Sequence, residues 1–510
     1  MGSTWSGVGG GSTPAHLDLD SPHLLDDMCE RPVEYWCLIP PDELHRVLSR
    51  IDPEVRCARV IPCALHTLAG GDGTGPWPAA RPPHPPHAVA AQGIFDTVDA
   101  ALLRAAGQPR AALRHAAQIA DAPLSAATSL FDNTHGWRPY LALQRGVTTL
   151  LAGDFGDAAL HLGRATFWRS PRHLGNIERD AHAKLALLHA FVGDAGVAPW
   201  HLRAVAATPP SQSWSEPEVA ATARLAHLAL DDSRGGAPDG TESVGDDDDV
   251  FTSSLREMWP FALWLQARLL LQQRRSEDAS ALLDHVERAA PPGIAGDGIA
   301  ASIIPATRTL IWRQRNEFAL AHAALDRADP ECDLTLLARA HLTLAGGGYT
   351  EAADLSRRLA ARTRDLRRMH LAAIGIGAAA ALRRGDTGGA SEALRPLIGD
   401  GRPFTPAEAA WLPRDALALA HGLLVAASPE AASESSSGGR RSTPAQPALT
   451  PGERQMLALL ASPMTRQEIA SELYLSINTI KTRIHRLYRR LGVDSRADAV
   501  SYGRRTGLLS

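Results

Sequence analysis

The chain has 510 residues, of which 45% are hydrophobic, and its formal net charge is −4. This length is enough for two or three domains with buried cores. No run of about 18 uncharged apolar residues occurs, and the first residues have neither a basic region nor an apolar stretch. We therefore expect no membrane span, no secretory signal and a cytoplasmic protein. Five cysteines in this length indicate a reducing compartment and exclude a disulfide framework.

Residues 1–69 have no pattern that defines a fold. The segment has His45 and His66 near four cysteines, which are Cys29, Cys37, Cys57 and Cys63. These residues could bind a metal ion or sense oxidation, but the C-x7-C and C-x5-C spacings are not those of a zinc knuckle. Free cysteines are commonly just buried. We therefore expect a core role for the cysteines and for Trp36, and no metal site.

Three segments are predicted to be linkers: 70–87 is rich in Gly and Pro, 233–250 is acidic, and 428–448 is rich in Ser and Pro. Such compositions cannot bury enough apolar surface to become ordered. The four consecutive aspartates in the second linker are more typical of a solvated loop than of a metal site. The linkers separate two long segments, 88–232 and 251–427, from a C-terminal domain at 449–510.

The two long segments contain a degenerate repeat. Six short turns each end in an alanine that starts the next helix: Ala158, Ala198, Ala279, Ala321, Ala352 and Ala390. The gaps between them are 40, 81, 42, 31 and 38 residues. Amphipathic helices flank the turns, and a small alanine lets the two helices of a hairpin approach closely. A period of about 34–45 residues is typical of helix-pair solenoids. The expected fold is all-α, a solenoid resembling tetratricopeptide repeats, with an irregular all-α domain as the alternative.

Scattered histidines on these helices have no paired ligand spacing, so we expect structural roles for them. They are His115, His161, His182, His189, His322 and His341.

Residues 449–510 predict four short helices. Three of the helices begin after N-cap residues at Thr450, Thr465 and Ser476, and the fourth after Ser495. The third helix has apolar residues at helical spacing: Ile480, Ile484, Leu487 and Leu491. Gly492 then ends this helix. The apolar residues predict that one face of the third helix is buried and that the other is exposed.

The exposed face predicts contact with DNA, because Arg and Lys pair with phosphates or guanine, while Thr, His and Asn read base edges. The candidate DNA-binding residues of the domain are Thr465, Ser476, Asn478, Thr479, Lys481, Thr482, Arg483, His485, Arg486, Arg489 and Arg490. Residues 449–510 have ten basic and five acidic side chains, a charge of +5, which leaves −9 on residues 1–448. A solvated basic helix is the alternative, but the three capped helices at this spacing favour a DNA-binding domain.

The segment resembles the LuxR-type helix-turn-helix domain of bacterial transcription regulators. Five short motifs carry the resemblance: Leu449-Thr450-Pro451, Glu468-Ile469-Ala470, Thr479-Ile480-Lys481-Thr482, Arg489-Arg490-Leu491-Gly492-Val493 and Gly507-Leu508-Leu509. The match covers 62 of 510 residues. It implies binding in the DNA major groove, base contacts from Lys481, Thr482 and His485, and a homodimer formed on DNA through residues 495–505. Gly452, Ser462-Pro463 and Arg483 depart from the pattern of the family and bear on site preference.

The repeats also look like the sensor segment of MalT-type regulators, which end in a LuxR-type domain. Those proteins carry an ATPase with a G-x-x-x-x-G-K-[S/T] loop. Here the only lysines are Lys184 and Lys481, and neither follows such glycines. The implied architecture lacks the ATPase, a phosphorylated receiver domain and any cofactor.

The expected function is a transcription regulator whose repeats sense a small molecule or a partner protein, with RNA polymerase as a further candidate partner. One alternative is a docking scaffold with a DNA-binding tail. The other is an enzyme with a hidden site in residues 1–427. The sequence contains no nucleophile elbow, H-E-x-x-H, paired C-x-x-C or nucleotide loop, which favours a protein that is not an enzyme.

Overall fold

The chain divides into two compact units, residues 1–428 and 429–510. The computed structural model describes residues 14, 16–70, 88–121, 136–167, 171–233, 255–291, 293–398 and 404–427, and individual residues between 456 and 500. In this described part every regular element is a helix and no strand occurs. None of the helices described is long and apolar enough to cross a membrane.

The segment of undefined fold, residues 1–69, forms five short helices. They are α1 (Leu24–Glu30), α2 (Pro32–Leu38), α3 (Pro41–Ser49), α4 (Pro53–Cys57) and α5 (Val60–Gly70). Two contacts fix α2 to the loop before α12: Trp214 Nε1 donates to the Trp36 carbonyl at 2.6 Å, and Ser213 Oγ donates to the Cys37 carbonyl at 2.7 Å. The five cysteines of the chain are free thiols, and burial raises the pKa of Cys37 to about 12. The expected core role of Cys37 and Trp36 is confirmed.

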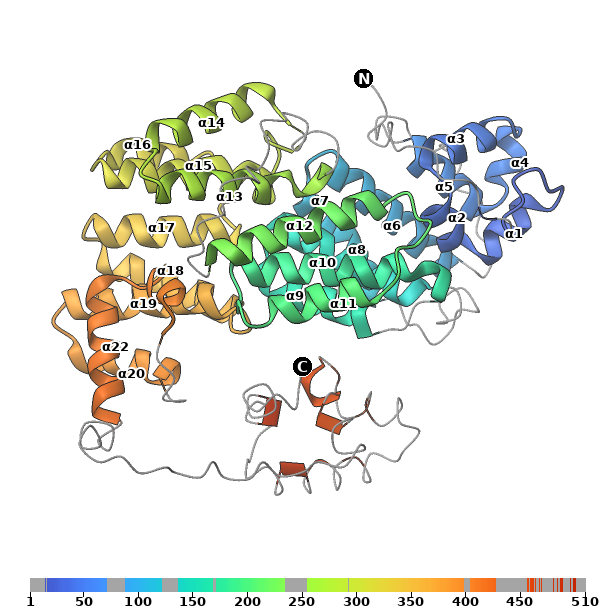
Figure 1. Ribbon diagram of the computed structural model, residues 1–510. Coiled ribbons are helices and arrows are strands. Elements are labelled where there is room, and N and C mark those ends of the chain that lie inside the picture. The colour runs from blue at the N-terminus through green and yellow to red at the C-terminus, as the bar shows by residue number, and fades with distance from the viewer. Residues whose placement is uncertain are drawn as a thin grey trace. The chain divides into compact units, whose positions relative to one another are not determined.

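The rest of the first unit is a series of helical hairpins (Figure 1). The first half comprises α6 (Ala88–Ala105), α7 (Pro109–Asp121), α8 (Trp137–Ala152), α9 (Phe155–Phe167), α10 (Gly175–Phe191), α11 (Ala198–Ala207) and α12 (Glu216–Ser233). The second half comprises α13 (Trp259–Gln272), α14 (Ser276–Ala289), α15 (Gly298–Gln314), α16 (Phe318–Leu325), α17 (Asp333–Ala345), α18 (Tyr349–Arg362), α19 (Arg367–Arg383), α20 (Thr387–Ile398), α21 (Pro406–Ala409) and α22 (Arg414–Ala427). Single 3-10 turns precede α10 and α13, at Arg172–Leu174 and Arg256–Met258.

Six of these hairpins share one turn geometry. In each turn, a residue with positive φ stands two positions before the next helix: Gly107, Gly153, Arg274, Asn316, Gly347 and Gly385. The N–H of the following residue donates to the carbonyl five residues earlier at 2.8–3.0 Å, as Asp154 does to Thr149. This bond closes the C-terminus of the first helix as a Schellman motif. The repeat is therefore a structural repeat at the level of backbone hydrogen bonds.

All six turn alanines predicted to lie between helices are fully buried. Five of them are the fourth residue of the second helix of their hairpin, as Ala352 is in α18. Ala198 differs, because it is the first residue of α11 and no residue of positive φ precedes it. One more turn of the shared geometry, at Gly107, places the buried Ala112 at the fourth position of α7. The alanine pattern in the sequence did not predict that turn.

The second half of the unit docks on the turns of the first half in matching order. The N–H groups at the starts of α15, α17 and α19 donate to carbonyls just after the ends of α6, α8 and α10: Asp297 to Gly107 at 3.1 Å, Asp333 to Gly153 at 3.0 Å, and Met369 to Val192 at 2.9 Å. We call this line of contacts the seam. A Cβ on Gly153 would lie 2.3 Å from Cys332 Sγ, so the Cys332 side chain leaves no room for a side chain at residue 153.

Ion pairs between half-buried or buried side chains reinforce the seam. Arg110 on α7 pairs with Asp154 at 3.0 Å and with Asp329 at 2.8 Å. Arg362 pairs with Asp333 at 2.8 Å and also with Asp154. These pairs satisfy carboxylates that would otherwise be costly to bury.

At the third point of the seam, the buried Arg368 donates to the carbonyls of His189 at 2.8 Å and Gly193 at 3.1 Å, and to that of Ala190. A guanidinium at this helix end satisfies the last carbonyls and opposes the negative end of the helix dipole.

Candidate nucleic-acid interface

The described residues of the second unit define its apolar core. The buried ones are Met456, Leu457, Leu460, Met464, Ile469, Ile480, Ile484, Leu487, Tyr488 and Ala499. They come from all four predicted helices. Burial of these described residues is what a small helical domain needs, because each short helix is marginal without tertiary packing.

The third predicted helix is oriented by its buried side chains. Ile480, Ile484 and Leu487 are helical and almost completely buried, as their spacing of 4 and 3 residues predicts. Tyr488 is also buried, which the sequence pattern did not indicate. Residues 487 and 488 are adjacent, so the buried face is wider than the strip of aliphatic positions. The width of the face limits which positions of this helix can face outward.

Arg496 ties the start of the fourth helix to the end of the first. Its Nε donates to the Leu460 carbonyl at 2.9 Å, and Nη2 donates to the Ser462 carbonyl. A cation is favoured there because helix C-termini expose carbonyls and carry the negative end of the dipole. One of the ten basic residues of this segment therefore has a structural role inside the unit.

Ser462 accounts for one departure from the LuxR-type pattern. Its hydroxyl donates to the Leu459 carbonyl at 2.6 Å and accepts from the Met464 N–H at 3.4 Å. A serine side chain thus supplies local hydrogen bonds at this helix end.

The candidate DNA-binding residues lie outside the described residues, so their positions remain predictions. They are Thr465, Ser476, Asn478, Thr479, Lys481, Thr482, Arg483, His485, Arg486, Arg489 and Arg490. Of the predicted dimer contact at 495–505, the structure describes Arg496, Ala499 and Val500. Ala499 is buried within the unit and Val500 is half-buried.

Several histidines of the first unit are buried. His182 Nδ1 lies 2.9 Å from His201 Nδ1, and burial lowers the pKa of His182 to about 4. Burial lowers the pKa of His161 and of His341 to about 3. Imidazoles with such values are neutral near pH 7, as expected for structural histidines. His115 is different, because it lies beside two carboxylates.

Sequence comparisons find relatives of the C-terminal segment. The sequence model of "Bacterial regulatory proteins, luxR family" matches residues 447–502. "Probable transcriptional regulatory protein NarL" of Mycobacterium tuberculosis is 41% identical over 70 residues, which are 14% of this chain and 32% of that protein. "Spore germination protein GerE" of Bacillus subtilis is 42% identical over 55 residues, which are 11% of this chain and 74% of that protein.

The coverage of these matches is uneven. The chain spans about a third of the length of NarL but about three quarters of GerE. No solved structure matches the chain significantly. The relatives therefore bear on the C-terminal segment.

Proposed function

The chain belongs, through residues 447–502, to the luxR family of bacterial regulatory proteins, and we propose that it binds double-stranded DNA and regulates transcription. The observation that carries this proposal is the buried set Ile480, Ile484 and Leu487 within the segment that matches the family. A helix held by these residues has its opposite face free for the DNA major groove.

Helical periodicity assigns roles to the positions around the buried ones. At about 100° per residue, Thr482 and Arg489 fall nearly opposite the face of Ile480, Ile484 and Leu487. His485 falls between the centre and the edge of the outward half, and Lys481 falls at the edge, both on the side of Tyr488. We assign base contacts to Lys481, Thr482 and His485, and backbone contacts to the later arginines. Phosphate contacts set register, and base contacts set sequence preference.

The charge distribution supports DNA contact at one end of the chain. Residues 449–510 carry +5, whereas residues 1–448 carry −9. DNA phosphates attract the positively charged C-terminal segment and repel the negatively charged remainder of the chain. We therefore expect the helical repeats not to contact the duplex. On DNA the protein acts as a homodimer joined through residues 495–505, which suits operators with two half-sites.

The first unit, in this proposal, is the signal-receiving part of a cytoplasmic regulator, a tetratricopeptide-like array similar to the MalT sensor. Its effector is a small molecule or a protein, and RNA polymerase is a further partner. The repeated hairpin turns and their buried alanines support the array, because stacked helix pairs of this period build extended binding surfaces.

The test is selection of bound sequences from a genomic DNA library by the full-length protein, followed by titration of the best site at several salt concentrations. We expect a discrete site with dyad symmetry. We also expect log K to fall with log[salt] with a slope of about −0.9 per phosphate neutralised. No enrichment of any sequence together with salt-independent binding would overturn the proposal.

A further inference from the structure

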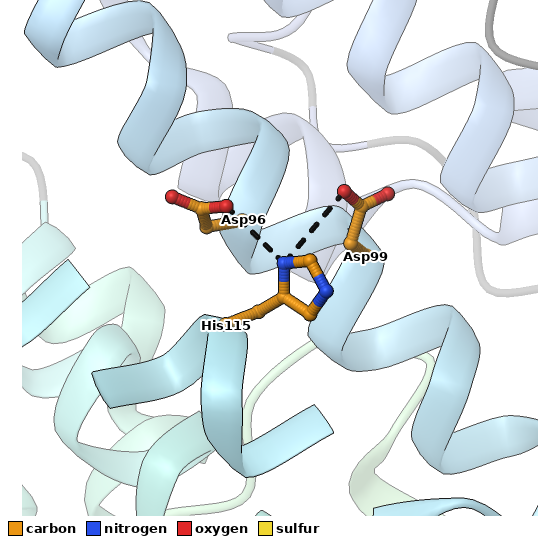
Figure 2. A group of neighbouring side chains, drawn as sticks. All are labelled: Asp96, Asp99 and His115. Atoms are coloured by element: carbon orange, nitrogen blue, oxygen red, sulfur yellow. Dashed lines mark hydrogen bonds and ion pairs between the residues drawn. The ribbon is translucent and has the colours of Figure 1, made fainter. Parts of the chain in front are cut away.

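Two carboxylates of α6 and one imidazole of α7 converge in the first hairpin of the repeat region. Asp96 and Asp99 are three residues apart and therefore lie on one face of α6. The Nδ1 atom of His115 lies 3.2 Å from Asp96 Oδ1 and 3.9 Å from Asp99 Oδ2. Figure 2 shows the carboxylates on either side of that ring nitrogen. One nitrogen therefore faces two acceptors, although a neutral imidazole has at most one proton there.

The three side chains form the one cluster in the described part of the chain with metal-ligand geometry, since one ligand atom from each lies within 4.8 Å of the others. When a divalent transition metal ion has tetrahedral coordination and metal–ligand bonds of about 2.0–2.2 Å, two of its ligand atoms lie about 3.4 Å apart. The 3.2 Å between Asp96 Oδ1 and His115 Nδ1 fits this value, and the 3.9 Å between Asp99 Oδ2 and the same nitrogen exceeds it by about 0.5 Å. Asp96 is 2% exposed, and His115 and Asp99 are half-buried, so one side of the cluster remains open to solvent.

The donor chemistry selects the kind of ion. Two carboxylate oxygens with one imidazole nitrogen suit Zn²⁺, Mn²⁺ or Co²⁺, whereas Ca²⁺ takes oxygen ligands only. Two carboxylates and a neutral imidazole carry a charge of −2, which a divalent ion balances.

We propose that Asp96, Asp99 and His115 form a binding site for a divalent transition metal ion that links α6 to α7. The site is open on one side, so water or a small anion completes the coordination. The proposal does not depend on DNA binding, since its residues lie in the first unit.

The test uses the full-length protein after treatment with a chelator and dialysis. Co²⁺ is the optical probe, and Zn²⁺ is measured by competition with a chromophoric chelator. The variants are Asp99→Asn and His115→Gln, each at a half-buried position. Circular dichroism and Tm without metal establish that they fold. His322→Gln is the control, because it removes an exposed imidazole from a chain that has 20 histidines.

We expect one Co²⁺ per chain with visible absorption bands, a Tm raised by Zn²⁺, and Zn²⁺ affinity at least about tenfold weaker in both variants. The His322→Gln variant should bind as the unaltered protein does. The proposal fails if folded Asp99→Asn and His115→Gln proteins keep full affinity, or if His322→Gln weakens binding equally. It also fails if the unaltered protein binds neither metal. DNA affinity unchanged by these variants would leave the proposed regulatory function intact.

Discussion

The backbone N–H of Phe155 donates to Asp333 Oδ2 at 3.0 Å, so the first turn of α9 and the first turn of α17 share one buried carboxylate. The pKa of Asp333 is raised to about 7, mainly because the carboxyl group is buried and also because the Asp154 carboxylate is near. Arg362 and the Phe155 N–H act in the opposite direction but do not cancel the effect of burial.

The folded-state pKa of Asp333 lies above the unfolded value of about 3.9. Its stabilising contribution is therefore present below about pH 4 and is lost as the pH rises to about 7, by on the order of 1 kcal/mol per pH unit. Asp333→Asn should remove this dependence. Urea unfolding at several pH values would show the advantage of the unaltered protein over Asp333→Asn shrinking towards pH 7. Asp326→Asn, at an exposed carboxylate, is the control. Parallel pH profiles for the protein and Asp333→Asn would contradict the prediction.

Substitutions at the positive-φ position of the shared turn should change the free energy of unfolding in opposite directions, depending on whether the native residue is glycine. Gly385 has φ of +85°, and a Cβ there meets open space, so Gly385→Ala should cost about 1 kcal/mol from backbone conformation alone. Gly153→Ala should cost more, because its Cβ would also clash with Cys332. Arg274 has φ of +60°, so Arg274→Gly should be neutral or stabilising by up to about 1 kcal/mol. Urea denaturation measures all three, and equal losses for the two alanine variants would contradict the close approach at the seam.

Ala352 is fully buried at the fourth position of α18. Ala352→Leu should overpack the hairpin of α17 and α18 and lower the free energy of unfolding by about 1–3 kcal/mol. Ala361→Leu is a matched control in the same helix, because residue 361 is exposed. Equal denaturation midpoints for the two variants would show that the turn alanines do not limit helix approach.

Ile484 lies in the core of the second unit and is 3% exposed. Ile484→Asp places a carboxylate there without a partner, so this unit should unfold and DNA binding should be lost. Thermal denaturation of the full chain should then lose one transition while that of the first unit persists. A variant that keeps its DNA affinity would mean that the third helix is not held through this residue.

Lys481 and Arg489 separate base reading from backbone contact in the proposed interface. Lys481→Ala should weaken binding to the preferred site by about 1–3 kcal/mol and relax preference at one base pair. Arg489→Ala should weaken binding to preferred and scrambled duplexes by similar amounts, because phosphates are alike in every sequence. Fluorescence anisotropy with both duplexes measures this difference. The opposite pattern would mean that the helix is rotated from the orientation proposed.

Local patterns in the sequence predicted the parts of the structure that depend on local interactions. The spacing of Ile480, Ile484 and Leu487 predicts their burial because helical periodicity alone decides which residues share a face. The turn alanines were predicted because each lies within one hairpin. The burial of Tyr488 was not predicted, since an aromatic hydroxyl is tolerated both inside and at the surface.

The features that were missed depend on distant parts of the chain. Asp96 and Asp99 form a spacing common on solvated helices, and only the α6–α7 hairpin brings His115 to them. No sequence pattern in either half alone predicts the seam. Its three hydrogen bonds join backbone N–H and carbonyl groups, and every residue but proline has both.

The seam has a consequence for how the protein folds. An array whose repeats contact only their neighbours can nucleate anywhere and grow by short-range steps. Here Arg110 bonds to Asp297, Phe155 to Asp333 and Arg368 to Gly193 across sequence separations of 187, 178 and 175 residues. Contacts between residues this far apart in the sequence form late and slowly, because a long loop must close before any of them is made. During synthesis on the ribosome, the turns of the first half therefore cannot make these contacts until most of the second half has been synthesised.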